Sequence, residues 1–358
     1  MICKNVAKLS LLLLPLSIVC SNAFAQNESP VPARASEAEG LLAEPVPGNA
    51  AAVDAVDAVT GASSAGDEAA VAIEPAIAQE QTVLRAQVLL DRAHFSAGEI
   101  DGRTGSNFKT ALAGFQRNRG LDDDGSLGPM TWAELERDPA PTLVDYTVLA
   151  ADVEGPFEKL PQDMIERSKL PALGYASIAE AFGERFHASP KLLDSLNKGK
   201  QLDVVGETIQ VPNVLDAPAP SAVTQVIVDR SDKTLLLADA DGKVIAQFPS
   251  STGSEHDPLP VGDWKVNTIA LKPAFYYNPD LFWDADPTHS KAKLPPGPNN
   301  PVGMVWIDLS KEHYGIHGTS EPSRVGKTES HGCIRVTNWT AMLLSESVKA
   351  GMPVVLRE

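Results

Sequence analysis

The 358-residue sequence contains few cysteines, few aromatic residues and comparatively little positive charge. Its 30 Lys and Arg residues stand against 47 Asp and Glu residues, which gives a formal net charge of −17. Binding to nucleic acid depends on cationic contacts to phosphate, and no Lys/Arg cluster offsets the acidic balance. The composition therefore excludes a nucleic-acid partner.

Long apolar runs are also missing. The run Leu9–Val19 is short for a membrane span, and no later stretch approaches the roughly 20 apolar residues that a spanning helix needs. Lys4 and Lys8 precede this run, and Ala23–Ala25 follows it as a small-x-small cleavage site. We therefore predict that residues 1–25 are a signal peptide, that the protein is exported, and that the mature chain has no membrane segment.

Three cysteines occur, and this interpretation leaves one of them in the mature chain. Cys3 and Cys20 would leave with the signal, so Cys333 would be the single remaining thiol. Cys20 also allows a lipoprotein alternative, but Ser17 and Val19 stand where a lipobox has Leu and a small residue. Exported proteins normally pair their cysteines, so an unpaired thiol is either reactive or a buried small hydrophobe.

The region after the signal changes character near residue 80. Residues 26–79 are rich in Ala, Pro, Gly, Asp and Glu and contain no aromatic residue. Such a segment cannot bury enough apolar surface to offset its conformational entropy, which predicts a disordered acidic linker. In residues 80–138 the apolar residues recur at the spacing of a helix, and two Asp-Gly turns, at 101–105 and 124–128, separate three such segments. This pattern predicts a small three-helix domain.

A second unit, residues 145–214, has a βααβ outline. An extra segment at 158–173 interrupts it. The predicted elements are a strand at 146–149, a helix at 178–186, a helix starting at Ser189-Pro190 and a strand at 208–212.

The remainder of the chain, residues 222–358, is mainly strand-like. Short apolar runs follow one another, with a hairpin signal at 239–242 and one helix after Cys333. This predicts a β-sandwich or a barrel-like sheet with one late helix. The whole chain is therefore expected to be multidomain, with a mainly β C-terminal domain.

The environment of Cys333 in the sequence suits acyl transfer. His317 and His331 lie near the thiol in the chain, and a thiol with a pKa of about 8.5 becomes a strong nucleophile when an imidazole takes its proton. Gly318 and Gly332 permit close backbone approach, and amide N–H groups beside the nucleophile can hold an oxyanion.

This cluster has two other interpretations. A metal site would need His313 and His317 to share an ion, but four residues of extended chain separate their side chains by about 13 Å. No nearby carboxylate completes a ligand set, so neither a metal nor an organic cofactor is expected. The second alternative makes Cys333 an ordinary buried core residue.

The runs 317–319 (HGT) and 330–335 (SHGCIR) resemble the signature of the L,D-transpeptidase catalytic domain, also called the YkuD family. Residues 80–138 resemble a peptidoglycan-binding three-helix domain, and residues 145–214 are similar to a LysM wall-binding module. The YkuD resemblance covers about 222–357 and includes the segments 251–254, 260–264 and 300–303.

The resemblance implies roles for individual residues. Cys333 would be the nucleophile and His317 the general base, oriented by the carbonyl of Gly318. His331 and the backbone at Gly332 and Cys333 would form the electrostatic surroundings of the reaction.

Four further residues are candidates for substrate binding. Arg335 would bind a substrate carboxylate, for which its guanidinium is suited, although an internal ion pair is an equally good interpretation. Ser330 belongs to the same motif, and Tyr276 and Trp283 lie in a segment that could cover the donor peptide. Many relatives have Asp where this chain has Thr340, which removes any ion pair from that position.

The implied reaction is a two-step acyl transfer on peptidoglycan. Cys333 would attack the diaminopimelate carbonyl of a tetrapeptide stem and expel the terminal D-alanine. The thioester would then pass to an amine, giving a 3→3 cross-link, an attached envelope lipoprotein or an exchanged D-amino acid. Residues 80–214 would locate the enzyme on the wall in the periplasm, so that a 222–358 fragment would still process soluble stem peptides.

Two alternatives stay open. Water could replace the amine, which would make the protein an L,D-carboxypeptidase or a hydrolase. The protein could instead be a non-catalytic wall-binding protein.

Overall fold

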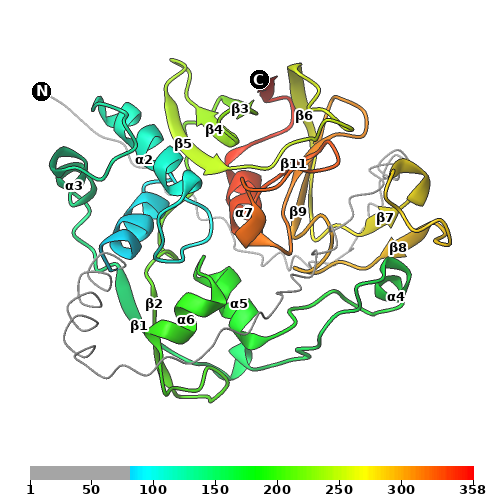
Figure 1. The fold of residues 1–358 in the computed structure, drawn as a ribbon, viewed down its shortest axis with the longest axis horizontal. Helices are drawn as coiled ribbons and strands as arrows, with labels where there is room; N and C mark the ends of the chain where they lie inside the picture. The colour runs from blue at the N-terminus through cyan, green and yellow to red at the C-terminus, as the bar shows by residue number, and fades with distance from the viewer. Residues whose placement is uncertain (1–80) are drawn as a thin grey trace, which may run out of the picture. The chain divides into compact units, whose positions relative to one another are not determined.

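The computed structural model describes residues 81–358 (Figure 1). The predicted signal peptide and all of the predicted linker lie outside the described residues. Within the described range, no helix is both long enough and apolar enough to cross a membrane.

Helices form the first part of the described chain. Buried Leu89, Phe95, Leu112 and Phe115 make their shared core. The Gln116 side chain ties the second inter-helix turn to this core, because its Oε1 accepts from the Gly125 amide and its Nε2 donates to Asp124 and to the Ser126 carbonyl. The helical segments are residues 81–92, α2 (Ser106–Arg119) and α3 (Pro129–Leu135).

The next unit has the predicted order of strand, helix, helix and strand. Ser177 and Ser189 begin the two helices, and each side chain accepts a hydrogen bond from an amide three residues further on. The two strands pair antiparallel, and the first begins three residues earlier than the sequence predicted. The elements are β1 (Leu143–Thr147), η2 (Ala150–Asp152), α5 (Ile178–Arg185), α6 (Pro190–Leu196) and β2 (Thr208–Pro212).

The C-terminal region forms one eight-stranded mixed sheet in the order β11-β10-β9-β6-β12-β3-β4-β5. Two neighbouring pairs, β10 with β11 and β12 with β3, are parallel, and the other pairs are antiparallel. The strands are β3 (Gln225–Asp229), β4 (Thr234–Ala238), β5 (Val244–Pro249), β6 (Gly262–Leu271), β9 (Val305–Leu309), β10 (Gly315–His317), β11 (Ile334–Arg335) and β12 (Pro353–Arg357).

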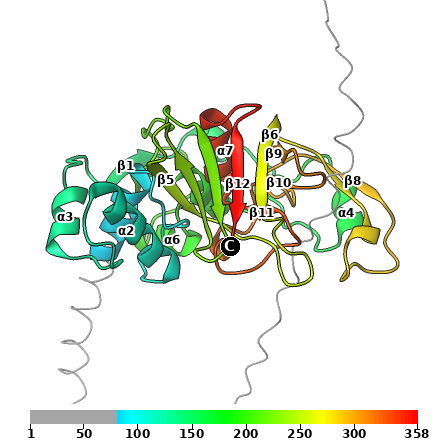
Figure 2. The same cartoon turned by 90° about the horizontal axis from the view of Figure 1, so that it is seen from above.

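This sheet curls on itself around a single core. Leu237 of β4 and Ile307 of β9 lie far apart in the strand order, yet they belong to the same buried cluster. The register between β6 and β9 shifts between Val266 and Ile269, which is the kind of irregularity that bends a strand. Figure 2 shows β5 and β9 on opposite sides of β12. The predicted sandwich or barrel-like sheet is therefore one continuous curled sheet.

The late helix is α7 (Asn338–Ser347), and Thr337 caps it by accepting from the Thr340 amide. Trp339, Met342 and Leu343 of this helix are only half-buried. Ala341 and Leu344 instead enter the core of the sheet. Trp339 faces the βααβ unit, where it stacks on His187 with ring centroids 5.0 Å apart.

The helical region covers the edge strand β5. Gln247 of β5 forms a bridge with Phe95, and its Nε2 donates to the Thr110 carbonyl at 2.7 Å. A Cβ on Gly114 would lie 2.2 Å from the Gln247 side chain, so the contact needs glycine there. The last strand of the sheet on this side is therefore protected from pairing with another chain.

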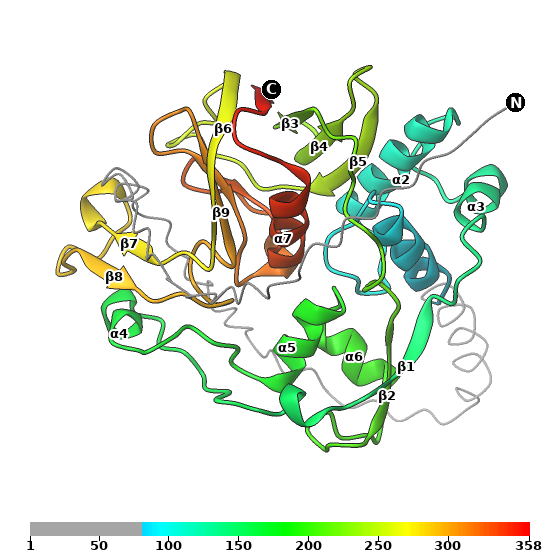
Figure 3. The same cartoon turned by 180° about the vertical axis from the view of Figure 1, so that it is seen from behind.

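The segment predicted to interrupt the βααβ unit leaves it completely. It contains α4 (Met164–Ser168), which lies beside β8 in Figures 1 and 3. β8 (Ala292–Leu294) pairs antiparallel with β7 (Phe275–Tyr277). The remaining short helices of the described chain are η3 (Pro279–Leu281) and η4 (Pro322–Arg324).

Candidate active site

The pairing of β10 and β11 brings Cys333 and His317 to one face of the sheet. Cys333 directly precedes β11, so its side chain lies on the same face as that of Arg335, two residues later. His317 of β10 is the partner of Arg335 in the parallel register, and aligned partners share a face. Cys333 is a free cysteine and is only 6% exposed.

The hydrogen bonding of His317 defines its tautomer. Nδ1 lies 2.6 Å from the carbonyl oxygen of Gly318. A carbonyl can only accept, so Nδ1 carries the hydrogen and Nε2 keeps its lone pair. Nε2 is buried and has no hydrogen-bond partner. Burial lowers the pKa of His317 to about 3. The hydrogen bond to the Gly318 carbonyl opposes this shift, and the nearby positive charge of Arg335 adds to it.

Tight packing fixes the Gly318 carbonyl. A Cβ on Gly318 would lie 2.1 Å from Oδ1 of Asn338, and a Cβ on Gly303 would lie 2.0 Å from the same oxygen. That oxygen also accepts from the Met304 amide at 3.0 Å. The two glycines are therefore needed for close packing around the group that orients His317.

Trp306 is a site residue that the sequence analysis missed. Its ring stacks on His317 with centroids 5.7 Å apart and an interplanar angle of 20°. A Cβ on Gly315 would lie 2.5 Å from the same indole, so Gly315 leaves room for the stack. The pairing of Trp306 with His317 in the β9–β10 register produces this contact.

The Cys333 thiol is held as a neutral donor. Its Sγ lies 3.6 Å from the carbonyl oxygen of His313, which is compatible with a weak S–H hydrogen bond. Burial raises the pKa of Cys333 to about 12; the Gly315 amide opposes this shift, and the carboxylates of Asp308 and Asp257 add to it. At neutral pH the thiol and the His317 imidazole are therefore both uncharged in this arrangement.

The residues next to Cys333 take distinct positions. Gly332 has φ of 106°, which strongly favours glycine, and a Cβ there would lie 3.2 Å from the Tyr314 ring. Nε2 of His331 lies 3.3 Å from Oδ1 of Asp284, and its ring packs edge-on against Phe282. No sequence pattern predicts that Asp284 or Tyr314 lies beside the loop that carries Cys333.

Ser330 and Arg335 form hydrogen bonds within the protein. The Ser330 hydroxyl donates to the Cys333 carbonyl at 2.6 Å. Nη2 of Arg335 donates to the Thr328 hydroxyl and to the Glu329 carbonyl, each at 2.8 Å. These contacts favour a structural role for Arg335 over binding of a substrate carboxylate. Ser330 and Arg335 both hold the loop that carries Cys333.

The two aromatic candidates differ. We define the cap as residues 278–291, between β7 and β8. Trp283 of the cap is 66% exposed and lies 4.9 Å from His256 and 6.3 Å from His331, measured between ring centroids. Tyr276 lies on the outer face of β7 beside Lys293. The fold therefore brings Trp283, and not Tyr276, to the loop that carries Cys333.

Over residues 81–358, no three His, Cys, Asp or Glu side chains converge in a way that could hold a metal ion. His317 is buried, whereas His313 is exposed.

Comparison with protein families identifies two parts of the chain. Residues 224–356 match the model of the L,D-transpeptidase catalytic domain, YkuD. Residues 79–135 match the putative peptidoglycan binding domain. Both predicted resemblances are confirmed at this level, and the likeness of residues 145–214 to a LysM module stays a prediction.

The chain is similar to several proteins that are named as L,D-transpeptidases. The "Putative L,D-transpeptidase YkuD" of Bacillus licheniformis is 28% identical over 179 residues, which cover 50% of this chain and 90% of that protein. The "Probable L,D-transpeptidase YbiS" of Escherichia coli is 38% identical over 153 residues, and the match covers 42% of this chain and 49% of that protein. A solved L,D-transpeptidase from Mycobacterium smegmatis aligns with a TM-score of 0.31 and 19% identity over 43% of this chain and 65% of that one.

Proposed function

We propose that this protein is an L,D-transpeptidase that acts on peptidoglycan tetrapeptide stems through a thioester at Cys333. The arrangement of His317 is the observation that carries the proposal. Within the segment that matches the YkuD model, the Gly318 carbonyl fixes Nδ1 of His317, and a buried Nε2 without a partner shares a face with a free thiol.

In the first step Sγ of Cys333 attacks the diaminopimelate carbonyl while its proton passes to Nε2 of His317. The amides of Gly332 and Cys333, with His331 beside them, are the candidates for holding the oxyanion. The tetrahedral intermediate then collapses to the thioester, and His317 returns the proton to the departing amine of D-alanine.

In the second step an acceptor amine attacks the thioester. His317 takes a proton from the attacking nitrogen and gives it to the sulfur, which restores the thiol. A stem-peptide amine gives a 3→3 cross-link, a lipoprotein amine gives anchoring, and a free D-amino acid gives exchange.

Because burial holds both reacting groups neutral, we expect proton transfer to accompany attack. A thiolate–imidazolium pair formed in advance would place two opposite charges in the buried site before the substrate arrives.

The remainder of the chain fits a wall-associated enzyme. We propose that residues 1–25 direct export to the periplasm, and that residues 80–138 and 145–214 bind the wall beside a catalytic domain at 222–358. The match of residues 79–135 to a peptidoglycan-binding model supports the first wall-binding assignment and a location at the cell envelope.

The test is turnover of purified disaccharide-tetrapeptides, with and without a D-amino acid, followed by mass spectrometry. We expect cross-linked dimers or exchanged stems from the wild type. We expect none from Cys333→Ser or Cys333→Ala, although both should melt at the wild-type temperature. Accumulation of tripeptides alone would favour the carboxypeptidase, and unchanged stems would reject the proposal.

A further inference from the structure

One segment connects the βααβ unit with the surroundings of Cys333. We call residues 158–174 the strap. Its backbone joins the catalytic domain directly: the Leu173 amide donates to Pro296, and the Leu173 carbonyl accepts from the Asn299 amide, both at 3.0 Å. A Cβ on Gly297 would lie 2.0 Å from the Leu173 carbonyl oxygen, so the approach depends on glycine.

The strap also contributes apolar side chains to the site. Met164 and Leu173 belong to the same buried cluster as Cys333, together with Tyr277 of β7 and Phe282 of the cap. The strap is therefore part of the packing that surrounds the thiol.

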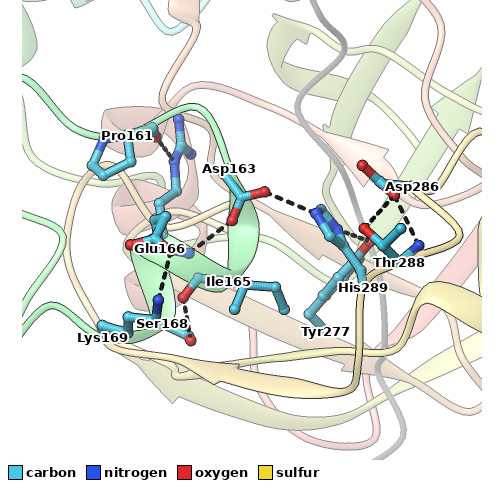
Figure 4. Close-up of polar contacts among 11 residues, drawn as sticks. Pro161, Asp163, Ile165, Glu166, Ser168, Lys169, Tyr277, Asp286, Thr288 and His289 are labelled. Atoms are coloured by element: carbon cyan, nitrogen blue, oxygen red, sulfur yellow. Dashed lines mark hydrogen bonds and ion pairs between the residues drawn. The ribbon is translucent and has the colours of Figure 1, made fainter.

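A chain of three polar side chains links strap and cap (Figure 4). Oδ2 of Asp163 lies 2.8 Å from Nε2 of His289, and Nδ1 of His289 lies 3.0 Å from the Tyr277 hydroxyl. The carboxylate accepts from Nε2–H, and the Tyr277 hydroxyl can donate to a bare Nδ1 or accept from a protonated one, so every member has a suitable partner. Asp163 lies in the strap, His289 in the cap and Tyr277 at the base of the cap.

Asp163 is held in place by its own helix. Its Oδ1 caps α4 by accepting from the Glu166 amide at 2.8 Å, which leaves Oδ2 for His289. This amide and His289 hold the pKa of Asp163 below its usual range. The carboxylate is therefore ionised at neutral pH, and its helix leaves Oδ2 available to His289.

The other end of the cap reaches the thiol loop. Phe282 and Trp283 pack against the His331 ring, and Asp284 lies beside its Nε2. Displacing the cap from the strap would therefore disturb the residues that flank Cys333.

We propose that the strap sets the position of the cap over Cys333 through Asp163, His289 and Tyr277, so that a segment outside the YkuD domain shapes the donor-peptide site. The donor-peptide part of this proposal rests on the proposed function above. Asp163 and His289 act as positioning residues.

Three variants each break at least one hydrogen bond of this chain and keep the local packing. Asp163→Ser keeps a capping hydroxyl but is too short to reach His289. His289→Phe keeps a ring against Tyr277, and Tyr277→Phe removes only a hydroxyl. Asp163→Asn retains an acceptor for Nε2–H and serves as the conservative rescue. Glu166→Gln is the matched control, because this exposed residue of α4 pairs with Lys169 of the strap.

Two readouts are needed: the rate at which iodoacetamide labels Cys333 in the native protein, and KM for the tetrapeptide donor. We expect labelling and KM to rise about three- to tenfold in the three disruptive variants, the effect of losing about one hydrogen bond. Asp163→Asn should stay within about twofold of the wild type, as should Glu166→Gln. The melting temperature should be similar in the whole set.

Labelling at the wild-type rate in Asp163→Ser and His289→Phe would overturn the proposal. Equal effects from Asp163→Ser and Glu166→Gln would also overturn it, because they would reflect general loosening of α4. Labelling at one fixed pH reports the access and reactivity of Sγ and requires no turnover. This arm therefore stands even if the wild type shows no turnover, a result that would reject the proposed function alone.

Discussion

At Cys333, burial raises the pKa of the thiol to about 12, so the reactive thiolate is scarce at neutral pH. Deprotonation increases as the pH approaches the pKa from below. We expect iodoacetamide labelling in the native protein to be slow at pH 7 and to rise about tenfold per pH unit up to pH 9. Intact-protein mass spectrometry measures the rate, with Cys333→Ala as the unlabelled control. A rate that levels off between pH 6 and 8 would instead show a preformed thiolate–imidazolium pair.

A second test concerns Gly318, whose carbonyl orients His317. Alanine there would bring Cβ to 2.1 Å from Asn338 Oδ1, so the Gly318 carbonyl must move and His317 loses its fixed orientation. We expect turnover to fall about 100-fold, the scale of a 1 Å misplacement, with a stability loss of about 1–3 kcal/mol.

Gly128→Ala is the comparison, because nothing lies within 4 Å of the added Cβ. It should leave turnover unchanged. Full turnover in Gly318→Ala would mean that this carbonyl does not orient the base.

The sequence could single out Cys333 and His317 as candidates but could not predict which residues surround them. A thiol, an imidazole and nearby glycines in one stretch of sequence are compatible with acyl transfer. Trp306 and Asp284 reach the site through strand register and through the cap, which no local pattern encodes. The hydrogen bonds of Arg335 to Thr328 and Glu329 depend on the conformation of the loop, which no local pattern encodes either.

Among the elements, short-range signals were the reliable ones. The Asp-Gly turn at 239–242 predicted the β4–β5 hairpin, and Ser189-Pro190 predicted the start of α6. The curl of the sheet and the destination of the strap depend on contacts between distant residues. Asp163 and His289, for example, are 126 positions apart.

The packing of α5 on α7 predicts a pH effect on stability. Glu184 of α5 accepts from Asn338 Nδ2 at 3.1 Å, and burial raises its pKa from 4.5 to about 8. Between these values the folded protein keeps a proton that the unfolded chain has lost. Stability should therefore fall as the pH rises through this window.

Glu184→Gln resembles the protonated carboxyl and should reduce the fall in melting temperature between pH 5 and 8. Some decline should persist, because burial also raises the pKa of Glu99, to about 7. Exposed Glu166→Gln is the control. Parallel curves for the wild type and Glu184→Gln would contradict a buried neutral carboxyl.

At the scale of the whole molecule, the structure argues against an independent catalytic fragment. The strap supplies Met164 and Leu173 to the cluster around Cys333, and the helical region covers β5. A 222–358 fragment should therefore process soluble stems at least about tenfold more slowly than an 81–358 fragment, and should aggregate more readily.

Steady-state turnover and light scattering of the two fragments provide the measurement. Equal kcat/KM values would show that the contacts with residues 81–214 are dispensable, as the sequence alone suggested.

The position of β12 bears on how the chain reaches its folded state. β12 is the last described strand in chain order, yet it lies between β6 and β3 within the sheet. The strands on its two sides cannot join until residues 353–357 have been synthesised. Before β12 is made, the strands on its two sides therefore form two separate half-sheets. The strap likewise has no partners until residues more than a hundred positions downstream have been made. Residues 222–358 can complete their sheet only after β12 has been synthesised, which leaves the two half-sheets open to chaperones until that strand is in place.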